Sequence, residues 1–430
     1  MNKPSFKKYP LPKLLLYNSF SNDSLILLHQ KAELKEAAVY EFYPALLQKA
    51  QQRGLFDHLW HSYLIDTLLT DDNLFTSSLS FAQKSSIDSA LWDLAAHEIE
   101  MLRKYFARPL PPTDLGLIEN IVSNMPAPLE RTIYGSNYAA AIKDFHSMFF
   151  LAPLAVVMDK LADFHYRWGY GDICRFSFFD WQKGLKGIAS ADDITMSELI
   201  GYQHQKDTLM KNTEAFLADK PANNVLLYGQ RGTGKSSMVK AIVNKYAAKG
   251  LRLVSLSRYS LEDLPEILLD LPRYKQKFII FLDDLSFDND EKDYKYIKTY
   301  IEGGAAVLPS NVLLYATSNR RHLVAESWHD RCENGEEIHI GDTVSEKLSL
   351  AERFGITIHF ASPDQEQYLA IVEGIAQNEG LDIDREYLRR EALKWERWQN
   401  SRSARTARQF INDLMGQTPS AYKRECSVEK

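Results

Sequence analysis

The 430-residue sequence predicts an α/β core with a mostly parallel, five-stranded sheet and flanking helices, preceded by a mostly α-helical N-terminal domain. Three observations lead to this prediction. Apolar runs alternate with segments of helical periodicity after residue 220, which is the βαβ pattern of a parallel sheet. A glycine-rich loop follows the first apolar run directly. Before residue 190, helical periodicity dominates and strand-like alternation is rare.

The N-terminal domain is expected to span residues 1–185. Apolar residues recur at helical spacing over 25–43, 56–69 and 86–106, and Pro44 is expected to break the pattern. Residues 134–181 are dense in aromatic side chains, which form either a core or a docking surface. The core is favoured because aromatic side chains bury large apolar areas. The region shows no catalytic constellation, so its role stays open.

Composition narrows the class of protein. The net charge of −6 argues against a broadly basic protein that coats nucleic acid. The three cysteines lie far apart without C-x-x-C spacing, which suits a reducing compartment. The longest apolar run, residues 148–158, contains Pro153 and is too short to cross a bilayer. We therefore expect a cytoplasmic protein with no membrane span.

The glycine-rich loop, GQRGTGKS at residues 229–236, fits the phosphate-binding pattern G-x-x-x-x-G-K-[ST]. Its glycines allow the backbone to approach an anion, and the amides of the following helix face the phosphates. Lys235 is placed to reach the β- and γ-phosphates, and the Ser236 hydroxyl to bind Mg²⁺. The loop residues expected to bind ATP are Gly229, Gln230, Arg231, Gly232, Thr233, Gly234, Lys235, Ser236 and Ser237.

Polar residues follow the later strands, which are expected at 251–256, 278–282, 312–317 and 356–360. Ligands of such sheets sit at the carboxyl ends of the strands. Asp283 is placed there to hold Mg²⁺, and Asp284 to act as the general base for an attacking water. Both could instead be a solvated loop start, where Asp favours turns. The phosphate-binding loop upstream favours the functional interpretation.

Four segments carry a resemblance to a known family: LIGY at 199–202, NVLLYG at 224–229, DDLSF at 283–287 and ATSNRR at 316–321. Residues 194–416 resemble AAA+ ATPases, and more narrowly a bacterial AAA-type family labelled a domain of unknown function. The resemblance implies Walker A at 229–236 and Walker B at Asp283–Asp284. It also implies an adenine pocket lined by Ile200 and Tyr202, and a sensor 1 role for Asn319.

The Walker B segment departs from the family pattern. Most AAA+ proteins end this motif with Asp-Glu, whereas here it ends with Asp-Asp. The side chain of Asp284 is one methylene shorter than that of Glu, which puts its reach to the water in doubt. The shorter side chain therefore favours slow hydrolysis.

Two arginines later in the chain have candidate roles. Residues 348–355 resemble the AAA+ segment in which an arginine finger, here Arg353, reaches the nucleotide of a neighbouring subunit. A surface ion pair with Glu352 or Glu346 is the alternative. Arg405, near the start of a helix, opposes the helix dipole and is expected to face phosphate. The resemblance to AAA+ proteins implies the sensor 2 role for it. Pairing with Asp413 or other acidic residues is the alternative.

The remaining boundaries and the function follow. Residues 186–361 are the expected AAA+ core, 362–418 a helical lid with Ser362 as first N-cap, and 419–430 a flexible tail. We expect ATP- and Mg²⁺-dependent hydrolysis in a homo-oligomer, coupled to remodelling of a protein or nucleic-acid client. The alternatives are a slowly hydrolysing switch or scaffold that docks a protein through the N-terminal domain, and a small-molecule kinase.

Overall fold

The computed structural model describes residues 13–81, 83–112, 117–125, 136–189, 194–285, 308–319 and 354–416. The chain divides into two compact units. The N-terminal unit holds Met1–Phe179, Leu185–Ser190 and Arg273–Gln276, and the sheet unit holds Asp180–Gly184, Ala191–Pro272 and Lys277–Lys430. Arg353, the candidate arginine finger, lies outside the described residues.

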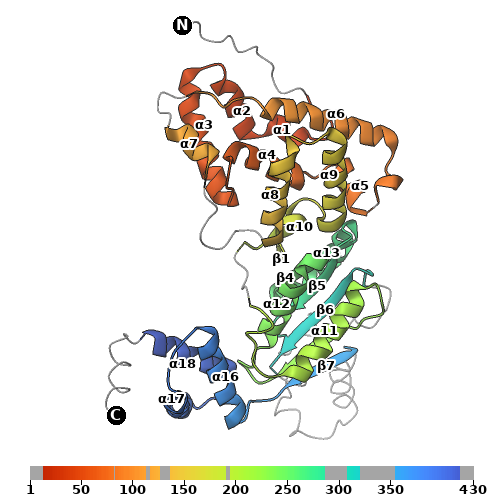
Figure 1. Cartoon of the computed structure of the whole chain (residues 1–430). Coiled ribbons are helices and arrows are strands. Elements are labelled where there is room, and N and C mark those ends of the chain that lie inside the picture. Colours follow the sequence, from red (N-terminus) through yellow and green to blue (C-terminus); the bar gives the residue numbers. More distant parts are fainter. Residues whose placement is uncertain are drawn as a thin grey trace. The chain divides into compact units, whose positions relative to one another are not determined.

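The N-terminal unit is built from helices, as expected (Figure 1). One expectation is wrong: Pro44 lies inside helix α3 and does not end it. The break falls earlier, between α2 and α3. The helices are α1 Asn18–Asn22, α2 Ser24–Ala32, α3 Glu36–Arg53, α4 Leu59–Thr70, α5 Leu74–Phe81, α6 Ser89–Phe106, α7 Leu117–Ser123, α8 Ser136–Phe149, α9 Leu154–Trp168 and α10 Asp172–Arg175.

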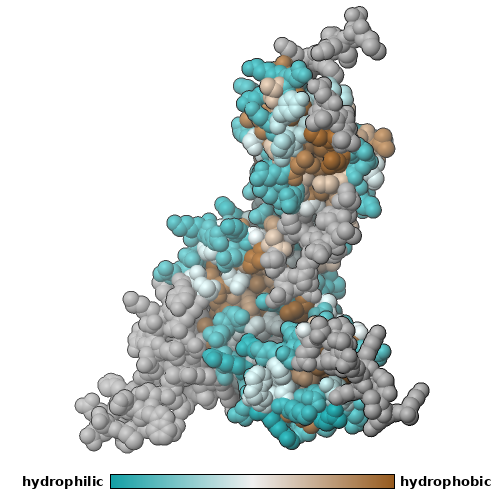
Figure 2. Space-filling view, turned by 90° about the vertical axis from the view of Figure 1, so that its left-hand side faces the viewer, coloured by the Kyte–Doolittle hydropathy of each residue, from teal (hydrophilic) through white to brown (hydrophobic). Residues whose placement is uncertain are grey.

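Aromatic side chains fill the core of this unit. Trp60 on α4 is fully buried, and its ring packs against Phe42 of α3 at 5.3 Å and Phe106 of α6 at 5.1 Å between centroids. From the aromatic-rich segment, Tyr138 and Phe164 are buried in the same cluster. These side chains are core, as favoured from the sequence. The face shown in Figure 2 mixes polar side chains with apolar areas.

The described strands form a seven-stranded sheet in the order β2-β1-β4-β5-β6-β3-β7. The pairs β4–β5, β5–β6, β6–β3 and β3–β7 are all parallel. This confirms the α/β fold class and adds two short strands that the sequence prediction missed. The bounds are β1 Phe178–Trp181, β2 Leu185–Gly187, β3 Val225–Gly229, β4 Leu251–Leu256, β5 Lys277–Leu282, β6 Val312–Ser318 and β7 Ile356–Phe360.

The central strands are largely apolar and buried because helices cover the sheet. Five of the six residues of β4 are buried, and every residue of β6 is buried. Helices that flank the sheet include α11 Gln203–Leu217, α12 Lys235–Tyr246 and α13 Leu264–Asp270 (Figure 1). The parallel register brings the ends of β3, β5 and β6 to one edge of the sheet.

The C-terminal part of the sheet unit is a small three-helix layer, which we name the lid. Tyr368, Val372 and Ile411 are fully buried in its own core. The first helix is capped by Asp364, which forms a capping box with Gln367, and not by Ser362 as expected. The N-cap residue is the one whose side chain accepts the N3 amide, and here the Asp364 carboxylate accepts the amide of Gln367. The lid helices are α16 Gln365–Asn378, α17 Arg385–Gln399 and α18 Ala404–Gly416.

No helix among the described residues has the length and apolar character needed to cross a membrane.

Candidate functional site

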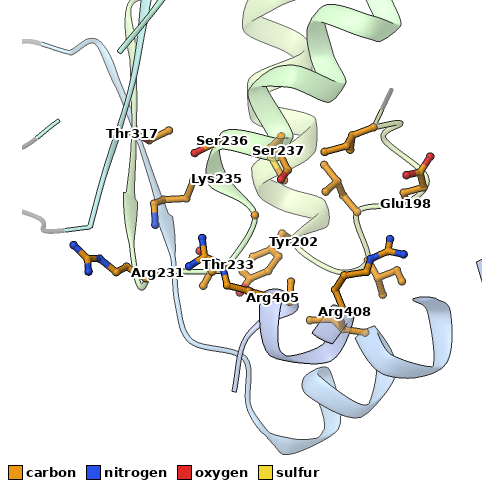
Figure 3. Close-up of a pocket in the computed structure, with 18 of the residues that line it drawn as sticks. Glu198, Tyr202, Arg231, Thr233, Lys235, Ser236, Ser237, Thr317, Arg405 and Arg408 are labelled. Carbon is orange, nitrogen blue, oxygen red and sulfur yellow. The ribbon is translucent and has the colours of Figure 1, made fainter. Parts of the chain in front are cut away.

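A pocket of about 680 Å³ lies within the sheet unit, between the carboxyl edge of the sheet and the lid (Figure 3). Its volume falls within the range of pockets that bind small ligands, about 300–1,000 Å³. The loop after β3, the residues after β5 and β6, and helices α16 and α18 line it. Segments far apart in the sequence therefore meet at one place.

The loop after β3 depends on glycine. Gly229, Gly232 and Gly234 all have positive φ, at 138°, 77° and 92°. A Cβ on Gly229 would lie 2.1 Å from the carbonyl oxygen of Phe360, and one on Gly232 would lie 2.9 Å from Ser403 Oγ. The backbone can take this path only without side chains there. It then leads directly into α12, whose first amides face the pocket.

Lys235, the first residue of α12, is buried at the floor of the pocket. Its Nζ donates hydrogen bonds to the carbonyl oxygens of Gly229 at 2.9 Å and Gln230 at 2.8 Å, and to Asn319 Oδ1 at 3.2 Å. Burial lowers the pKa of the Lys235 ammonium, an effect that the nearby carboxylates of Asp284 and Asp283 oppose. A buried cation of this kind favours an anionic ligand.

Two carboxylates stand beside Lys235, at the end of β5. Asp283 Oδ1 accepts hydrogen bonds from Ser236 Oγ and from Thr317 Oγ1, each at 2.6 Å. The carboxylate of Asp284 accepts a hydrogen bond from the side-chain amide of Asn319. Hydroxyl and carboxylate oxygens are the ligands that Mg²⁺ prefers, so Ser236 and Asp283 fit a magnesium site.

The other end of the pocket is apolar. Ile200 lies there with Ile371 and Ile375 of α16. Ile200 packs closely on the lid, because a Cβ on Gly374 would lie 2.3 Å from Ile200 Cδ1. Tyr202 donates its hydroxyl to the carbonyl oxygen of Ala361 at 2.7 Å, which fixes the ring along the pocket wall. This apolar surface suits the flat face of a nucleobase.

Arginines from the loop and from the lid complete the lining. The amide of Arg405, on α18, donates to the carbonyl oxygen of Gly232 at 3.2 Å. Neither Arg405 nor Arg231 forms an ion pair with a described residue, Asp413 included. Arg408, one turn later, pairs with Glu379 instead. Figure 3 shows Arg405 and Arg408 on the same side of the pocket. The pocket thus holds the guanidinium groups of Arg231 and Arg405 beside the two carboxylates.

Most residues predicted from the sequence meet in this pocket. Gly229 and Gln230 are beside it and contribute carbonyl oxygens to Lys235. Sequence reasoning gave no role to Thr317 or to the lid residues at the apolar end. The predicted residues that line the pocket are Ile200, Tyr202, Arg231, Gly232, Thr233, Gly234, Lys235, Ser236, Ser237, Asp283, Asp284, Asn319 and Arg405.

The parallel sheet, the glycine loop entering a helix, the paired acids and the helical lid define a P-loop protein of the AAA+ type. The chain belongs to the family described as "Protein of unknown function (DUF815)", whose sequence model matches residues 174–418, more than half of its length. The predicted resemblance is thereby confirmed, and the match begins some twenty residues before the predicted start.

Solved structures of RuvB from Thermotoga maritima are also similar to the chain. Two variants of that protein each align with a TM-score of 0.34 and 14% identity, over 51% of this chain and 72% of theirs. The structure described as the RuvB Holliday junction branch migration motor aligns over the same shares with a TM-score of 0.31. Among curated proteins, none matches this chain.

Proposed function

We propose that this chain binds Mg²⁺-ATP in the pocket between sheet and lid and hydrolyses its terminal phosphate. One observation carries the proposal: Lys235, Asn319 and Asp284 are joined by hydrogen bonds at the end of the glycine loop, beside the Ser236–Asp283 pair. A cation, an amide, a carboxylate and a hydroxyl–carboxylate pair are thus within reach of one phosphate group. That is the set of groups that phosphoryl transfer to water requires.

The phosphates would lie on the loop amides and at the start of α12. Lys235 would exchange its loop carbonyl partners for β- and γ-phosphate oxygens, and the guanidinium groups of Arg231 and Arg405, which form no ion pair with a described residue, would neutralise further charge. Ser236 and Asp283 would hold Mg²⁺, directly or through water. The bound ion would neutralise charge on the β- and γ-phosphate oxygens. The adenine would lie against Ile200 and Tyr202.

Hydrolysis would use Asp284 and Asn319. Asp284 accepts a proton from the water that attacks the γ-phosphorus, while the bond from that phosphorus to the β,γ-bridging oxygen breaks. The products are ADP and inorganic phosphate. Asn319 holds the Asp284 carboxylate through its amide, so that the water meets a fixed base. The Glu of most AAA+ proteins is absent, and the shorter side chain of Asp284 takes its place beside Asn319.

The active unit would be a homo-oligomer if Arg353 reaches the nucleotide of a neighbouring subunit. The lid would couple hydrolysis to movement, because its helix α18 touches the glycine loop directly. The remodelled client would be a protein or a nucleic acid, recognised by a surface outside the pocket. The domain limits 1–185, 186–361, 362–418 and 419–430 remain part of this proposal.

A nucleotide-dependent switch is the second candidate, and Asp284 is the observation that favours it. A base one methylene shorter than Glu leaves the attacking water less well held. Such a protein would bind ATP tightly, turn over slowly and dock a protein partner in one nucleotide state.

Steady-state ATP hydrolysis by the full chain, with Lys235→Ala in parallel, tests the proposal. The protein is assayed alone and with single-stranded DNA, duplex DNA or an unfolded polypeptide. Turnover that one of these additives stimulates and that the variant lacks would support a remodeller and identify its client. Mg²⁺-dependent nucleotide binding with negligible turnover throughout would favour the switch. Failure to bind nucleotide would overturn both.

A further inference from the structure

One hydroxyl group lies between the two acids of the site. Thr317, in strand β6, is only 2% exposed. Its Oγ1 donates to Asp283 Oδ1 at 2.6 Å and accepts the backbone amide of Asp284 at 2.9 Å. Thr317 does not belong to the glycine loop or to the acid pair, and its side chain touches both acids at once.

The direction of these hydrogen bonds is fixed by chemistry. An ionised carboxylate can only accept a hydrogen bond, and a backbone N–H can only donate one. The Thr317 hydroxyl must therefore give its proton to Asp283 and present a lone pair to Asp284. A hydroxyl is the smallest side-chain group that can do both from this position.

The main chain of Thr317 adds a third hydrogen bond to the turn that contains Asp284. Its carbonyl oxygen accepts the amide of Leu285 at 2.7 Å, so the amides of Asp284 and Leu285 both bind Thr317. Asp284 itself has φ of 52°, in the left-handed region that side-chain-bearing residues adopt at a cost. Thr317 thus holds the turn in a conformation that directs the Asp284 side chain to Asn319.

The same contact also orients Asp283. Its Oδ1 is shared by the Ser236 and Thr317 hydroxyls. Its Oδ2 has no hydrogen-bond partner in the described part of the chain. The carboxylate is therefore locked by one oxygen and offers the other to a metal ion or its water.

We propose that Thr317 is a positioning residue that sets the metal-facing oxygen of Asp283 and the side-chain direction of Asp284 through one hydroxyl group. This inference rests on the proposed nucleotide site. It explains how Asp can stand where most AAA+ proteins have Glu: the left-handed turn anchored on Thr317 brings the shorter side chain to Asn319.

Two pairs of residues isolate the hydroxyl. Thr and Val differ chiefly in that group, and so do Ser and Ala. The test therefore compares the wild type with Thr317→Val, and Thr317→Ser with Thr317→Ala. Each full-length protein is checked by far-UV circular dichroism and thermal unfolding. If the Val variant does not fold, the Ser–Ala pair alone decides.

Three quantities are measured for each protein: the Mg²⁺ concentration that half-saturates binding of a fluorescent ATP analogue, the affinity for that analogue in EDTA, and kcat and KM for ATP. Supporting groups around metal ligands typically change affinity or activity by about 10–100-fold. Loss of the hydroxyl is expected to raise the Mg²⁺ requirement and lower kcat within that range. Binding in EDTA should change by less than about threefold, since the glycine loop is untouched. The Ser variant should stay close to the wild type.

The inference is overturned if Thr317→Val matches the wild type in both Mg²⁺ requirement and kcat, or if Ser is as impaired as Ala. A wild-type protein that binds nucleotide and turns over poorly still yields the Mg²⁺ comparison. A wild type that binds no nucleotide, like Lys235→Ala, refutes the proposed function and this inference with it. The two failures are therefore distinguishable.

Discussion

Asn319 Oδ1 accepts a hydrogen bond from Lys235 Nζ across 3.2 Å, while the amide nitrogen of the same side chain donates to Asp284. One side chain therefore joins the cation of the glycine loop to the carboxylate after β5. An amide can do this because it carries an acceptor and a donor at opposite corners. The charges of Lys235 and Asp284 are held apart by one neutral group.

Replacing Asn319 by Ala should lower kcat by about 10–100-fold, because the base and the water lose their common support. The affinity for ATP should change by less than about threefold, since the loop and Lys235 remain. Steady-state kinetics and equilibrium binding of a fluorescent analogue measure the two quantities. A kcat equal to that of the wild type would remove Asn319 from the site.

Asp284 is the residue that separates an enzyme from a switch. Asp284→Asn keeps size and removes the proton acceptor, so turnover should fall by about 100-fold or more while nucleotide affinity is retained. Asp284→Glu is the matched change of length. We expect it to lower kcat as well, because the longer side chain moves the carboxylate away from the hydrogen bond that Asn319 donates to Asp284. If Glu instead raises turnover strongly, the native Asp limits hydrolysis and the switch gains support.

Arg405 and Arg408 allow a controlled test of the lid. Arg405 has no ion pair with a described residue, whereas Arg408 is paired with Glu379. Arg405→Ala should weaken ATP binding by about tenfold, the cost of one charge-assisted contact to phosphate. Arg408→Ala should weaken it by less than about threefold, since its charge is already neutralised. Isothermal titration calorimetry compares the two. Equal effects of both changes would contradict a specific role for Arg405.

The glycines of the loop should differ in their tolerance to substitution. A Cβ on Gly234 meets nothing within 4 Å, so Gly234→Ala carries only the cost of its positive φ, about 1–3 kcal/mol. Gly229→Ala carries that cost and a clash with the carbonyl oxygen of Phe360. Thermal unfolding should therefore show the larger loss of stability for Gly229→Ala. The reverse order would mean that strand β7 moves easily.

Acid should destabilise the N-terminal unit through His165. This side chain is fully buried, and burial lowers its pKa from 6.5 to about 4. Below pH 6.5 His165 becomes protonated in the unfolded chain, whereas in the folded unit it stays neutral until the pH approaches 4. Stability is thus present above pH 6.5 and is lost as the pH falls toward 4, by up to about 3 kcal/mol. Urea unfolding at pH 7 and pH 4.5 measures the loss.

His165→Gln is the control for that prediction. Its amide can still donate to the carbonyl oxygen of Gly169, which His165 Nδ1 contacts at 3.0 Å, but it does not titrate. The variant should lose less stability between the two pH values than the wild type. An equal loss would assign the acid sensitivity to other groups, among them His29 and His61, whose pKa values burial also lowers to about 4.

The sequence predicts the sheet well because strands β3, β5 and β6 consist largely of consecutive apolar residues. The runs at 251–256 and 356–360 match β4 and β7 residue for residue. Strands β1 and β2 were missed because four and three residues give no periodicity to detect. The prediction that Pro44 breaks the helix was wrong for a different reason. Packing against neighbouring helices stabilises α3 enough to tolerate a proline in its interior.

The site divides in the same way. Residues fixed by local motif, such as Lys235 and Asp283, are readable from the sequence. Thr317 is not, because its role depends on β5 and β6 being neighbours in register, with Leu282 opposite Ala316. Ile371 of the lid lines the pocket only because α16 packs against Ile200, and no spacing in the sequence predicts that packing. Pairings between distant segments are the part that only the fold supplies.

The hydrogen bond from the Arg405 amide to the Gly232 carbonyl oxygen connects the main chain of helix α18 with the main chain of the glycine loop. Such a bond does not depend on which side chain stands at position 405, and Gly232 has none that could keep the two backbones apart. A force that lifts α18 therefore acts first on the loop proposed to bind phosphate. If the proposed function holds, opening the lid would also displace the loop that binds phosphate, and a pull on the C-terminal helices would then promote product release.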